Sequence, residues 1–254
     1  MPELMDRPLL LFAVSFVVMA LSAWIGTLLG TRRPLDADLR EDFSVVQTAT
    51  LTLLGLIIGF SFSMAVTRYD QRKNYEAEEA NAIGTEYVRA GLLPAADAAK
   101  VRELLRSYLN QRVLFYTTRD TRQLEQINAS TAQLQSDLWS AVQTPAAAQP
   151  TFMVALAVSG MNDVLNSQGY TRAAWWYRIP GAAWALMAAI AICCNVLVGY
   201  NARGTEGSKK WFFLLPLVVS VAFFFIADMD SPRGGLIRIH PQNLEGVARS
   251  LRAP

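Results

Sequence analysis

The sequence predicts an all-α integral membrane protein, with four transmembrane helices and a helical cytoplasmic bundle inserted between the second and third spans. The first observation is composition, since 52% of the 254 residues are hydrophobic. The second is that charged residues are absent from four long stretches. The third is that the polar segment between these stretches repeats apolar residues at helical spacing. No stretch alternates apolar and polar residues in the way that a half-buried strand requires.

Each uncharged stretch is long enough to cross the hydrocarbon core of a bilayer. At about 1.5 Å per residue, a helix of about 20 residues crosses a core of about 30 Å. Asp, Glu, Lys, Arg and His are absent from residues 9–30, 45–66, 179–200 and 211–227. We therefore predict a first transmembrane hairpin over residues 1–66, with spans 9–30 and 45–66. The second hairpin covers residues 179–229, with spans 179–200 and 211–229.

The long polar segment, residues 67–178, is predicted to be helical throughout. Residues 68–92 continue the second span without a helix-breaking residue until Pro94. Apolar residues recur every three or four positions over 96–118 and 120–143, which predicts two further helices. The sequence TPAAAQP at 144–150 is expected to end the second of them. Residues 151–178 are then expected to form a helix that returns to the membrane.

An even number of spans places both termini on the same side of the membrane as segment 67–178. The chain ends in a tail over residues 230–254. More Lys and Arg residues flank the membrane on this side than in the two short loops, so the positive-inside rule predicts that this side is cytoplasmic. The first span exceeds the apolar core of a usual signal peptide, so we expect it to be retained. The net charge of only +2 gives no reason to expect a nucleic-acid partner.

The second span carries a stripe of small and hydroxylated residues with bulkier residues along its edge. Gly55 and Gly59 form a small-xxx-small pair, which in lipid lets two helix backbones approach closely. One interpretation is therefore a helix-packing seam. The other is that the second spans of several copies surround an axis, where Leu56 and Phe60 form a hydrophobic constriction that gates by dewetting. The pore-lining residues would then be Thr52, Leu56, Phe60, Ser63 and Thr67.

Basic residues follow this span directly. In an assembly around an axis, Arg68, Arg72 and Lys73 would form a collar at the pore mouth and concentrate anions there. In a single copy, the same residues act as ordinary positive-inside anchors. The sequence leaves both interpretations open.

Polar residues within segment 67–178 form a second candidate group. Glu79 and Asn81 lie among small residues, so we expect them to be enclosed by neighbouring helices and to need hydrogen-bond partners. Candidate partners lie on the returning helix. The predicted polar network comprises Glu79, Asn81, Asn162, Asp163 and Arg172. It either fixes the bundle or lines a polar vestibule.

A third candidate group, the C-terminal motif, closes the fourth span. Asp228 and Asp230 lie at the C-terminal end of a helix, where the helix dipole disfavours a negative charge. We therefore expect a cationic partner, either Arg233 or Arg68. The group is either a structural ion pair or a functional site.

Catalytic motifs are absent from the sequence. His240 is the only histidine, Cys193 and Cys194 are adjacent and lack metal-ligand spacing, and there is no phosphate-binding loop or nucleophile elbow. We therefore expect a protein that is not an enzyme, with no cofactor and no metal site.

Three motifs carry a resemblance to a known family. GFSFSMAVTRY at 59–69 resembles the second-span motif of bestrophins, with Arg68 and Tyr69 at the positions of their arginine and aromatic residue. EANAIGTEYVRAGLLP at 79–94 and IADMDSPRGGLIRI at 226–239 resemble the bacterial bestrophin-like domain family of unknown function. The resemblance covers essentially the whole chain and implies the cytoplasmic (inner) membrane of a bacterium.

Bestrophins are pentameric anion channels whose neck is lined by bulky apolar residues of the second span. The resemblance places this neck at Thr52, Leu56 and Phe60, where Thr52 departs from the bulky pattern and implies a wider or differently gated constriction. Bestrophins also bind calcium through an acidic run after the fourth span. Here that position offers only Asp228 and Asp230, far fewer oxygens than the six to eight that calcium takes, so we expect no calcium switch.

The leading hypothesis is a bestrophin-like homo-oligomeric ion channel, a pentamer by resemblance, with anions favoured as cargo and the second span lining the pore. Its partners would be the lipid bilayer, further copies of the chain and small inorganic ions. The alternative is a membrane-anchored scaffold or signalling module whose cytoplasmic bundle binds a partner. This alternative requires tight, impermeable packing along the second span.

Overall fold

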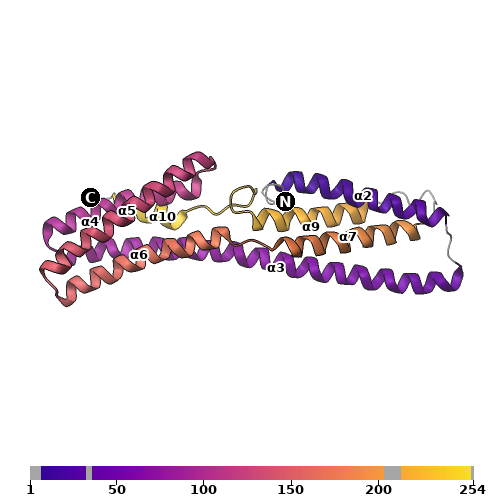
Figure 1. Ribbon diagram of the computed structural model, residues 1–254, viewed down its shortest axis with the longest axis horizontal. Helices are drawn as coiled ribbons and strands as arrows, with labels where there is room; N and C mark the ends of the chain where they lie inside the picture. Colours follow the sequence, from indigo (N-terminus) through magenta and orange to yellow (C-terminus); the bar gives the residue numbers. More distant parts are fainter. Residues whose placement is uncertain (1–6, 33–35, 203–212, 253–254) are drawn as a thin grey trace. The chain divides into compact units, whose positions relative to one another are not determined.

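The computed structural model describes residues 7–32, 36–202 and 213–252, and over these residues the chain is all-helical, with no strand. This confirms the predicted all-α class. The helices, in chain order, are α2 (Pro8–Arg32), α3 (Ala37–Arg89), the 3₁₀ turn η1 (Ala90–Leu92), α4 (Ala95–Thr117), α5 (Thr121–Ala148), α6 (Phe152–Trp176), α7 (Gly181–Asn201), α9 (Leu214–Asp230) and α10 (Gln242–Ser250) (Figure 1).

The helices belong to two compact units. The first unit contains residues 1–69 and 178–238, and the second contains residues 70–177 and 239–254. Helix α3 contributes to both units as one continuous helix of 53 residues. Its sequence is compatible with this length, because no proline interrupts it before Pro94.

In the first unit, α2 packs along α7 and α9 (Figure 1). The apolar core is formed by residues from four helices, among them Met19, Leu54, Met187, Phe223 and Ile226. Each of these side chains exposes 3% of its surface or less, so close packing between the helices holds this core together in a lipid environment.

Glycines bring α2 and α7 into backbone contact. A methyl group added at Gly26 would overlap the carbonyl oxygen of Val196, and one added at Gly199 would overlap the carbonyl oxygen of Ala23. Small residues at such positions let two helices approach closely where the surrounding lipid supplies no hydrophobic drive for their association. The sequence GTLLG, residues 26–30, is a small-xxx-small motif that carries this contact.

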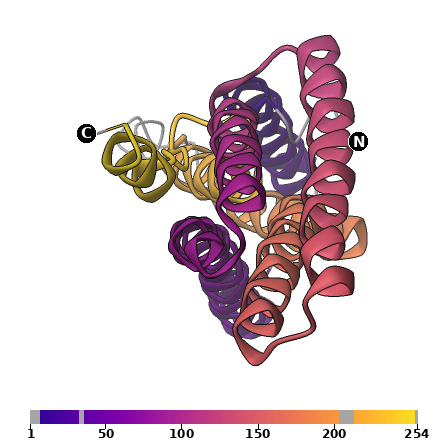
Figure 2. The ribbon, with the colours of Figure 1, turned by 90° about the vertical axis from the view of Figure 1, so that its left-hand side faces the viewer.

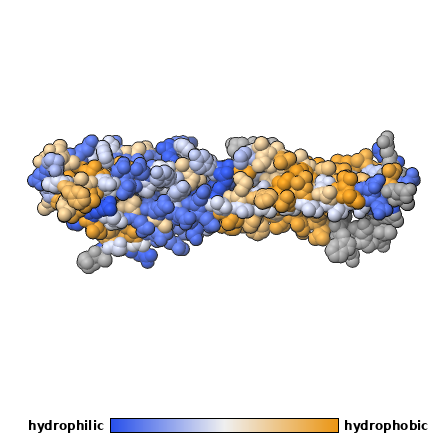
Figure 3. All heavy atoms as spheres, turned by 90° about the horizontal axis from the view of Figure 1, so that it is seen from below, coloured by the Kyte–Doolittle hydropathy of each residue, from blue (hydrophilic) through white to orange (hydrophobic). Residues whose placement is uncertain are grey.

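Three helical segments are long and apolar enough to cross a membrane by length and composition: Pro8–Arg32, Leu39–Leu92 and Phe152–Asn201. On the face shown in Figure 3, hydrophobic residues dominate the surface of the first unit, whereas the second unit is largely hydrophilic with smaller hydrophobic areas. This is the surface expected of a membrane protein. Helix α9 has 17 residues, and residues 211–212, where the sequence predicts the start of the fourth span, lie outside the described residues.

The second unit is a bundle formed by α4, α5, α6, α10 and the C-terminal part of α3. Figure 2 looks along this bundle, with α10 (yellow) at one edge. Side chains at helical spacing meet in the interior, where Val101, Leu105, Leu138, Met161 and Val164 are fully buried.

Two of the bundle helices begin at side-chain caps. The Asp120 Oδ1 accepts hydrogen bonds from the N–H groups of Arg122 and Gln123 at the start of α5. The Thr151 hydroxyl accepts one from the N–H of Val154 at the start of α6. Each cap satisfies donors that the first helical turn leaves without a partner, and contributes about 1 kcal/mol.

The C-terminal helix α10 is held by a buried acidic residue of α3. The carboxylate of Glu76 is 2% exposed and accepts hydrogen bonds from the backbone N–H groups of Asn243 (3.0 Å) and Leu244 (2.9 Å). Leu244 itself is fully buried. A carboxylate at this position satisfies the first donors of α10 and is favoured by the positive end of its dipole.

Helix α5 ends within the stretch 144–150, where the sequence predicts a break. Helix α5 passes through Pro145, which is buried, and ends at Ala148. Proline removes one hydrogen bond from a helix interior, but here only three residues follow it, and all three are alanines, the strongest helix formers. The N–H of Gln149 donates to the carbonyl oxygen of Pro145 at 2.8 Å, which closes the last turn.

Candidate functional site

Within the first unit, the described helices leave one face of α3 uncovered. Leu54, Ser61 and Ala65 are buried on the opposite face. Leu56 and Phe60 expose 54% and 63% of their surfaces. The uncovered face contains all five residues that the sequence predicts as pore-lining: Thr52, Leu56, Phe60, Ser63 and Thr67.

Open space lies beside the two glycines of this face. A methyl group added at Gly55 or at Gly59 would meet no atom within 4 Å. The close helix contact inside this unit is instead made by Gly26 and Gly199. If Gly55 and Gly59 form a packing seam, no helix among the described residues packs on it, and a helix of another copy could do so.

Threonine hydroxyls on this face are satisfied within α3 itself. The hydroxyl of Thr52 donates to the carbonyl oxygen of Thr48, and the hydroxyl of Thr67 donates to that of Ser63, both at 2.9 Å. This local bonding lets hydroxylated residues lie in an apolar medium without a further partner. The threonines alone therefore do not distinguish a water-filled path from a lipid-facing surface.

The basic residues after this face have different environments. Arg68 is half-buried and Lys73 is exposed, whereas Arg72 is only 1% exposed. The Arg72 Nε donates to the carbonyl oxygen of Ala174 (3.1 Å), and its Nη2 donates to that of Tyr177 (3.2 Å). Arg72 therefore caps the C-terminal end of α6, where the helix dipole favours a cation. The predicted collar of Arg68, Arg72 and Lys73 at a pore mouth stays a prediction.

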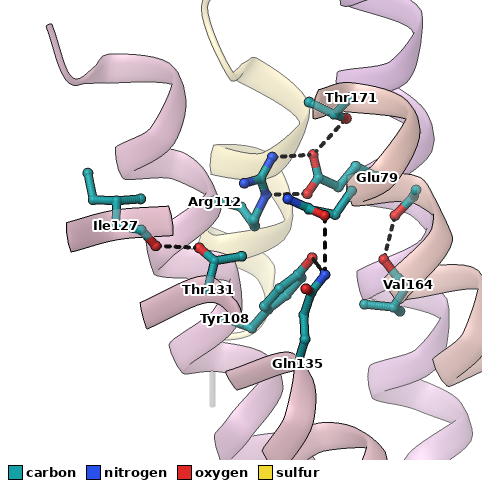
Figure 4. Close-up of polar contacts among 10 residues, drawn as sticks. Glu79, Tyr108, Arg112, Ile127, Thr131, Gln135, Val164 and Thr171 are labelled. Carbon is teal, nitrogen blue, oxygen red and sulfur yellow. Dashed lines mark hydrogen bonds and ion pairs between the residues drawn. The ribbon is translucent and has the colours of Figure 1, made fainter. Parts of the chain in front are cut away.

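A buried ion pair occupies the interior of the second unit (Figure 4). The side chains of Glu79 on α3 and Arg112 on α4 are fully buried and form a salt bridge through Arg112 Nε and Glu79 Oε1. Arg112 Nη2 also donates to Glu79 Oε2 at 3.3 Å, and the Thr171 hydroxyl of α6 donates to the same oxygen at 3.1 Å. One carboxylate thus connects three helices of the bundle.

The pair changes the proton affinity of its neighbours. Burial alone would lower the pKa of Arg112, but the Glu79 carboxylate outweighs this effect and raises it, so the guanidinium stays charged. Burial, and then the negative charge of Glu79, raise the pKa of Tyr108 well above its ordinary value. Tyr108 is therefore a neutral hydrogen-bonding group beside the pair, and Gln135 of α5 approaches its hydroxyl at 3.5 Å.

The predicted polar network is assembled differently from the expectation. Only Glu79 of the expected members is buried, while Asn81, Asn162, Asp163 and Arg172 are exposed. Asp163 lies 3.9 Å from Arg89 in an ion pair at the surface. Arg172 places its guanidinium over the Trp176 ring, 4.7 Å from the centroid. The reason is the orientation of α6, which turns small and apolar residues and Thr171 towards the interior.

The partner that the sequence analysis missed is Arg112. It follows Val101, Leu105 and Tyr108 along α4 at helical spacing, and all four are fully buried. An arginine at an interior position of an amphipathic helix requires a buried counter-charge. This spacing, together with the position of Glu79 among small residues, could have indicated a buried pair of Glu79 and Arg112.

The two carboxylates of the C-terminal motif bind backbone N–H groups. Asp228 accepts from Leu236 (Oδ1, 2.6 Å) and Ile237 (Oδ2, 2.8 Å), and both oxygens of Asp230 accept from Ile179 at 3.1 Å. Asp228 and Asp230 are 1% and 3% exposed. Asp228 closes the loop after α9, and Asp230 holds the chain entering α7.

This donor set does not fit calcium. Calcium takes six to eight oxygen ligands, and the oxygens of Asp228 and Asp230 already accept backbone hydrogen bonds. Arg233 is half-exposed, and the cationic partner predicted for these carboxylates, Arg233 or Arg68, stays a prediction. The motif therefore acts on the fold of the loop, and no metal-dependent step follows from it.

Asp228→Asn is expected to destabilise the loop over residues 231–240. The neutral amide accepts through one oxygen only and turns its NH₂ group towards a backbone N–H. Losing charge-assisted hydrogen bonds in this buried position costs about 1.5–3 kcal/mol. Hydrogen exchange of the Leu236 and Ile237 amides should become faster, while Asp70→Asn, an exposed control on α3, should leave it unchanged. Unchanged exchange in Asp228→Asn would contradict this role.

Comparison with known proteins agrees with this architecture. The chain matches the model of the bestrophin-like domain over residues 12–244. Its fold is similar to that of a bacterial bestrophin homologue from Klebsiella pneumoniae, with 13% identity, a TM-score of 0.67, and coverage of 94% of this chain and 96% of that chain. A variant of a crystallised membrane protein is similar at 14% identity, with a TM-score of 0.64 and coverage of 94% and 95%. No curated protein sequence matches significantly.

The structural matches, at such low identity, concern the fold alone. The family match is independent of them and spans nearly the whole sequence, including the two motifs at 79–94 and 226–239. Together with the apolar helices of the first unit, these findings make the protein a helical membrane protein that belongs to the bestrophin-like domain family.

Proposed function

We propose that the protein is a homo-oligomeric ion channel of bestrophin-like type, with α3 lining the path and anions as the favoured cargo. The observation that carries the proposal is the uncovered face of α3, on which Leu56 and Phe60 are largely exposed. A methyl group added at Gly55 or Gly59 would meet no atom of another helix within 4 Å. Family membership supports it, because bestrophins are anion channels.

In the proposed assembly, copies of α3 surround an axis, five of them by analogy with bestrophins. Gly55 and Gly59 let neighbouring copies approach closely. Leu56 and Phe60 then form an apolar constriction, which passes ions only when it is wetted. Arg68 and Lys73 supply positive charge at the mouth and raise the local concentration of anions. The chain spans the bacterial inner membrane four times, with residues 67–178 and both termini in the cytoplasm.

Purified protein in liposomes is expected to pass chloride. Phe60→Ala should raise the flux severalfold, because it removes the largest side chain from the constriction. Phe62→Ala is the matched control, since Phe62 is a neighbouring exposed phenylalanine outside the predicted pore-lining set. The measurement is chloride efflux normalised to reconstituted protein. A monomer in both mild detergent and native membranes, or equal fluxes from the two variants, would contradict the channel.

Cysteine scanning separates the channel from a membrane-anchored scaffold. Single cysteines at positions 52, 56, 60, 63 and 67 are introduced into a chain whose exposed Cys193 is changed to serine. A pore predicts periodic labelling by a water-soluble thiol reagent, whereas a sealed scaffold predicts uniform protection.

A further inference from the structure

Glu86 of the 79–94 motif has no part in the proposed pore. Its side chain is 1% exposed, and neither carboxyl oxygen has a hydrogen-bond partner among the described residues. An ionised carboxylate is strongly disfavoured in such a place, because it loses its water without gaining donors. The neutral, protonated form is the one that this environment accepts.

The carboxyl group of Glu86 is enclosed by a glycine of α6. A methyl group added at Gly160 would overlap Glu86 Oε2 and would lie 2.7 Å from Arg89 Nη1. Only glycine leaves room for the carboxyl group between α3 and α6. Because the group lies directly against the α6 backbone, water can reach it only if the two helices separate locally.

Charged groups near Glu86 come from both helices. Arg89 follows on α3, and Asp163 faces it from α6. Arg89 Nη1 lies 3.9 Å from Asp163 Oδ2, and the two side chains are 35% and 64% exposed. Arg102, on the neighbouring helix α4, donates instead to the carbonyl oxygen of Tyr87. The nearest cation therefore pairs with a surface carboxylate and leaves the buried one without a partner.

Arg89 and Asp163 have opposite effects on the pKa of Glu86. Burial raises the pKa of Glu86 to about 8, Arg89 lowers it by a smaller amount, and Asp163 raises it further. The folded chain therefore holds the proton more tightly than the unfolded chain does. As a result, the free energy of unfolding falls as the pH rises from about 4.5 towards about 8, and it levels off above that range.

We propose that Glu86 is a proton-binding site that keeps α3 packed against α6 while it is protonated. When the proton leaves, the carboxylate attracts Arg89 away from Asp163, and the contact at Gly160 loosens. Acid conditions therefore favour the packed contact, and alkaline conditions favour the loosened one. This inference concerns the second unit alone and does not depend on the presence of a pore.

Infrared spectroscopy of the full-length protein tests the protonation directly. We expect the carbonyl band of a protonated carboxylic acid at pH 6, disappearing with a midpoint near pH 8. Glu86→Gln should lack this band. Glu78→Gln, an exposed glutamate on the same helix, should retain it. Absence of the band at pH 6 in the wild type, or its persistence in Glu86→Gln, would overturn the proposal.

Hydrogen exchange tests whether the contact between α3 and α6 loosens when the proton leaves Glu86. After correction for the intrinsic effect of pH, exchange of the α6 amides around Gly160 should be about tenfold faster at pH 9 than at pH 6.5 in the wild type and in Glu78→Gln. In Glu86→Gln the corrected rate should be nearly independent of pH. A rate independent of pH in the wild type would overturn the switch.

Asp163→Asn provides a test that leaves Glu86 in place. Removing this carboxylate takes away a like charge and frees Arg89, so the midpoint of the infrared band should move to lower pH. Asp137→Asn, the same substitution in helix α5, is the control and should leave the midpoint unchanged. An unmoved midpoint in Asp163→Asn would overturn the role given to Arg89.

Discussion

Glu79→Gln is expected to unfold the second unit. The substitution keeps the size of the side chain but leaves the guanidinium of Arg112 charged and fully buried without a counter-charge. It also disturbs the hydrogen bond from Thr171. Breaking one side of a buried ion pair costs about 3–5 kcal/mol. This is a large part of the stability of a typical domain. Thermal unfolding and hydrogen exchange of α4 and α6 measure the loss.

Two controls distinguish the pair from a general effect of losing an acidic residue. Glu78→Gln changes an exposed neighbour and should shift stability by less than about 0.5 kcal/mol. The double variant Glu79→Leu with Arg112→Met removes both charges and should recover much of the loss, since apolar replacement of a whole buried pair is often neutral. A single variant as stable as the wild type would contradict the role of the pair.

Gly26→Leu is expected to separate α2 from α7. Even a methyl group at this position would overlap the carbonyl oxygen of Val196 and lie 2.8 Å from the backbone nitrogen of Tyr200. Backbone atoms have no alternative rotamer, so the helices must move apart and lose their packing. We expect a loss of at least about 3 kcal/mol. It is measured as the fraction folded during titration with a denaturing detergent.

Gly59→Leu is the matched control for this prediction. It makes the same substitution in another helix of the same unit. Here an added methyl group would meet no atom of another helix within 4 Å. The chain should fold as well as the wild type, and slightly better on helix propensity alone, by up to about 1 kcal/mol. If copies of α3 pack together as proposed, the same variant should change the assembly on size-exclusion chromatography. Equal losses of folding in Gly26→Leu and Gly59→Leu would contradict the contact described for α2 and α7.

The all-helical class and the apolar helices could be predicted because they depend on local sequence periods and on composition. The length of α3 followed from the absence of a breaker before Pro94. The end of α5 could be placed within residues 144–150 but not at a single residue, because Pro145 lies inside the helix. A proline near the end of a helix removes only one hydrogen bond, and the alanines behind it completed the last turn.

Side-chain partners were harder to predict, because they depend on how one helix is rotated against the next. The sequence placed Glu79 in an enclosed position, but it assigned partners from α6 that turn out to be exposed. Arg112 was not among the predicted partners, although it lies at helical spacing from the buried Tyr108. The glycine contact was predicted for Gly55 and Gly59, whereas the chain itself uses Gly26 and Gly199. Both spans contain small-xxx-small pairs, and the sequence does not say which one finds its neighbour within the same chain.

The attachment of α10 has a thermodynamic consequence. A helix of nine residues is too short to persist in water by itself, because nucleation is unfavourable and few bonds follow it. Its order depends on the hydrogen bonds to the carboxylate of Glu76 and on the burial of Leu244. Detachment and melting of this segment are thus a single event, and loss of its contacts with Glu76 would convert residues 242–250 from a helix into a random coil.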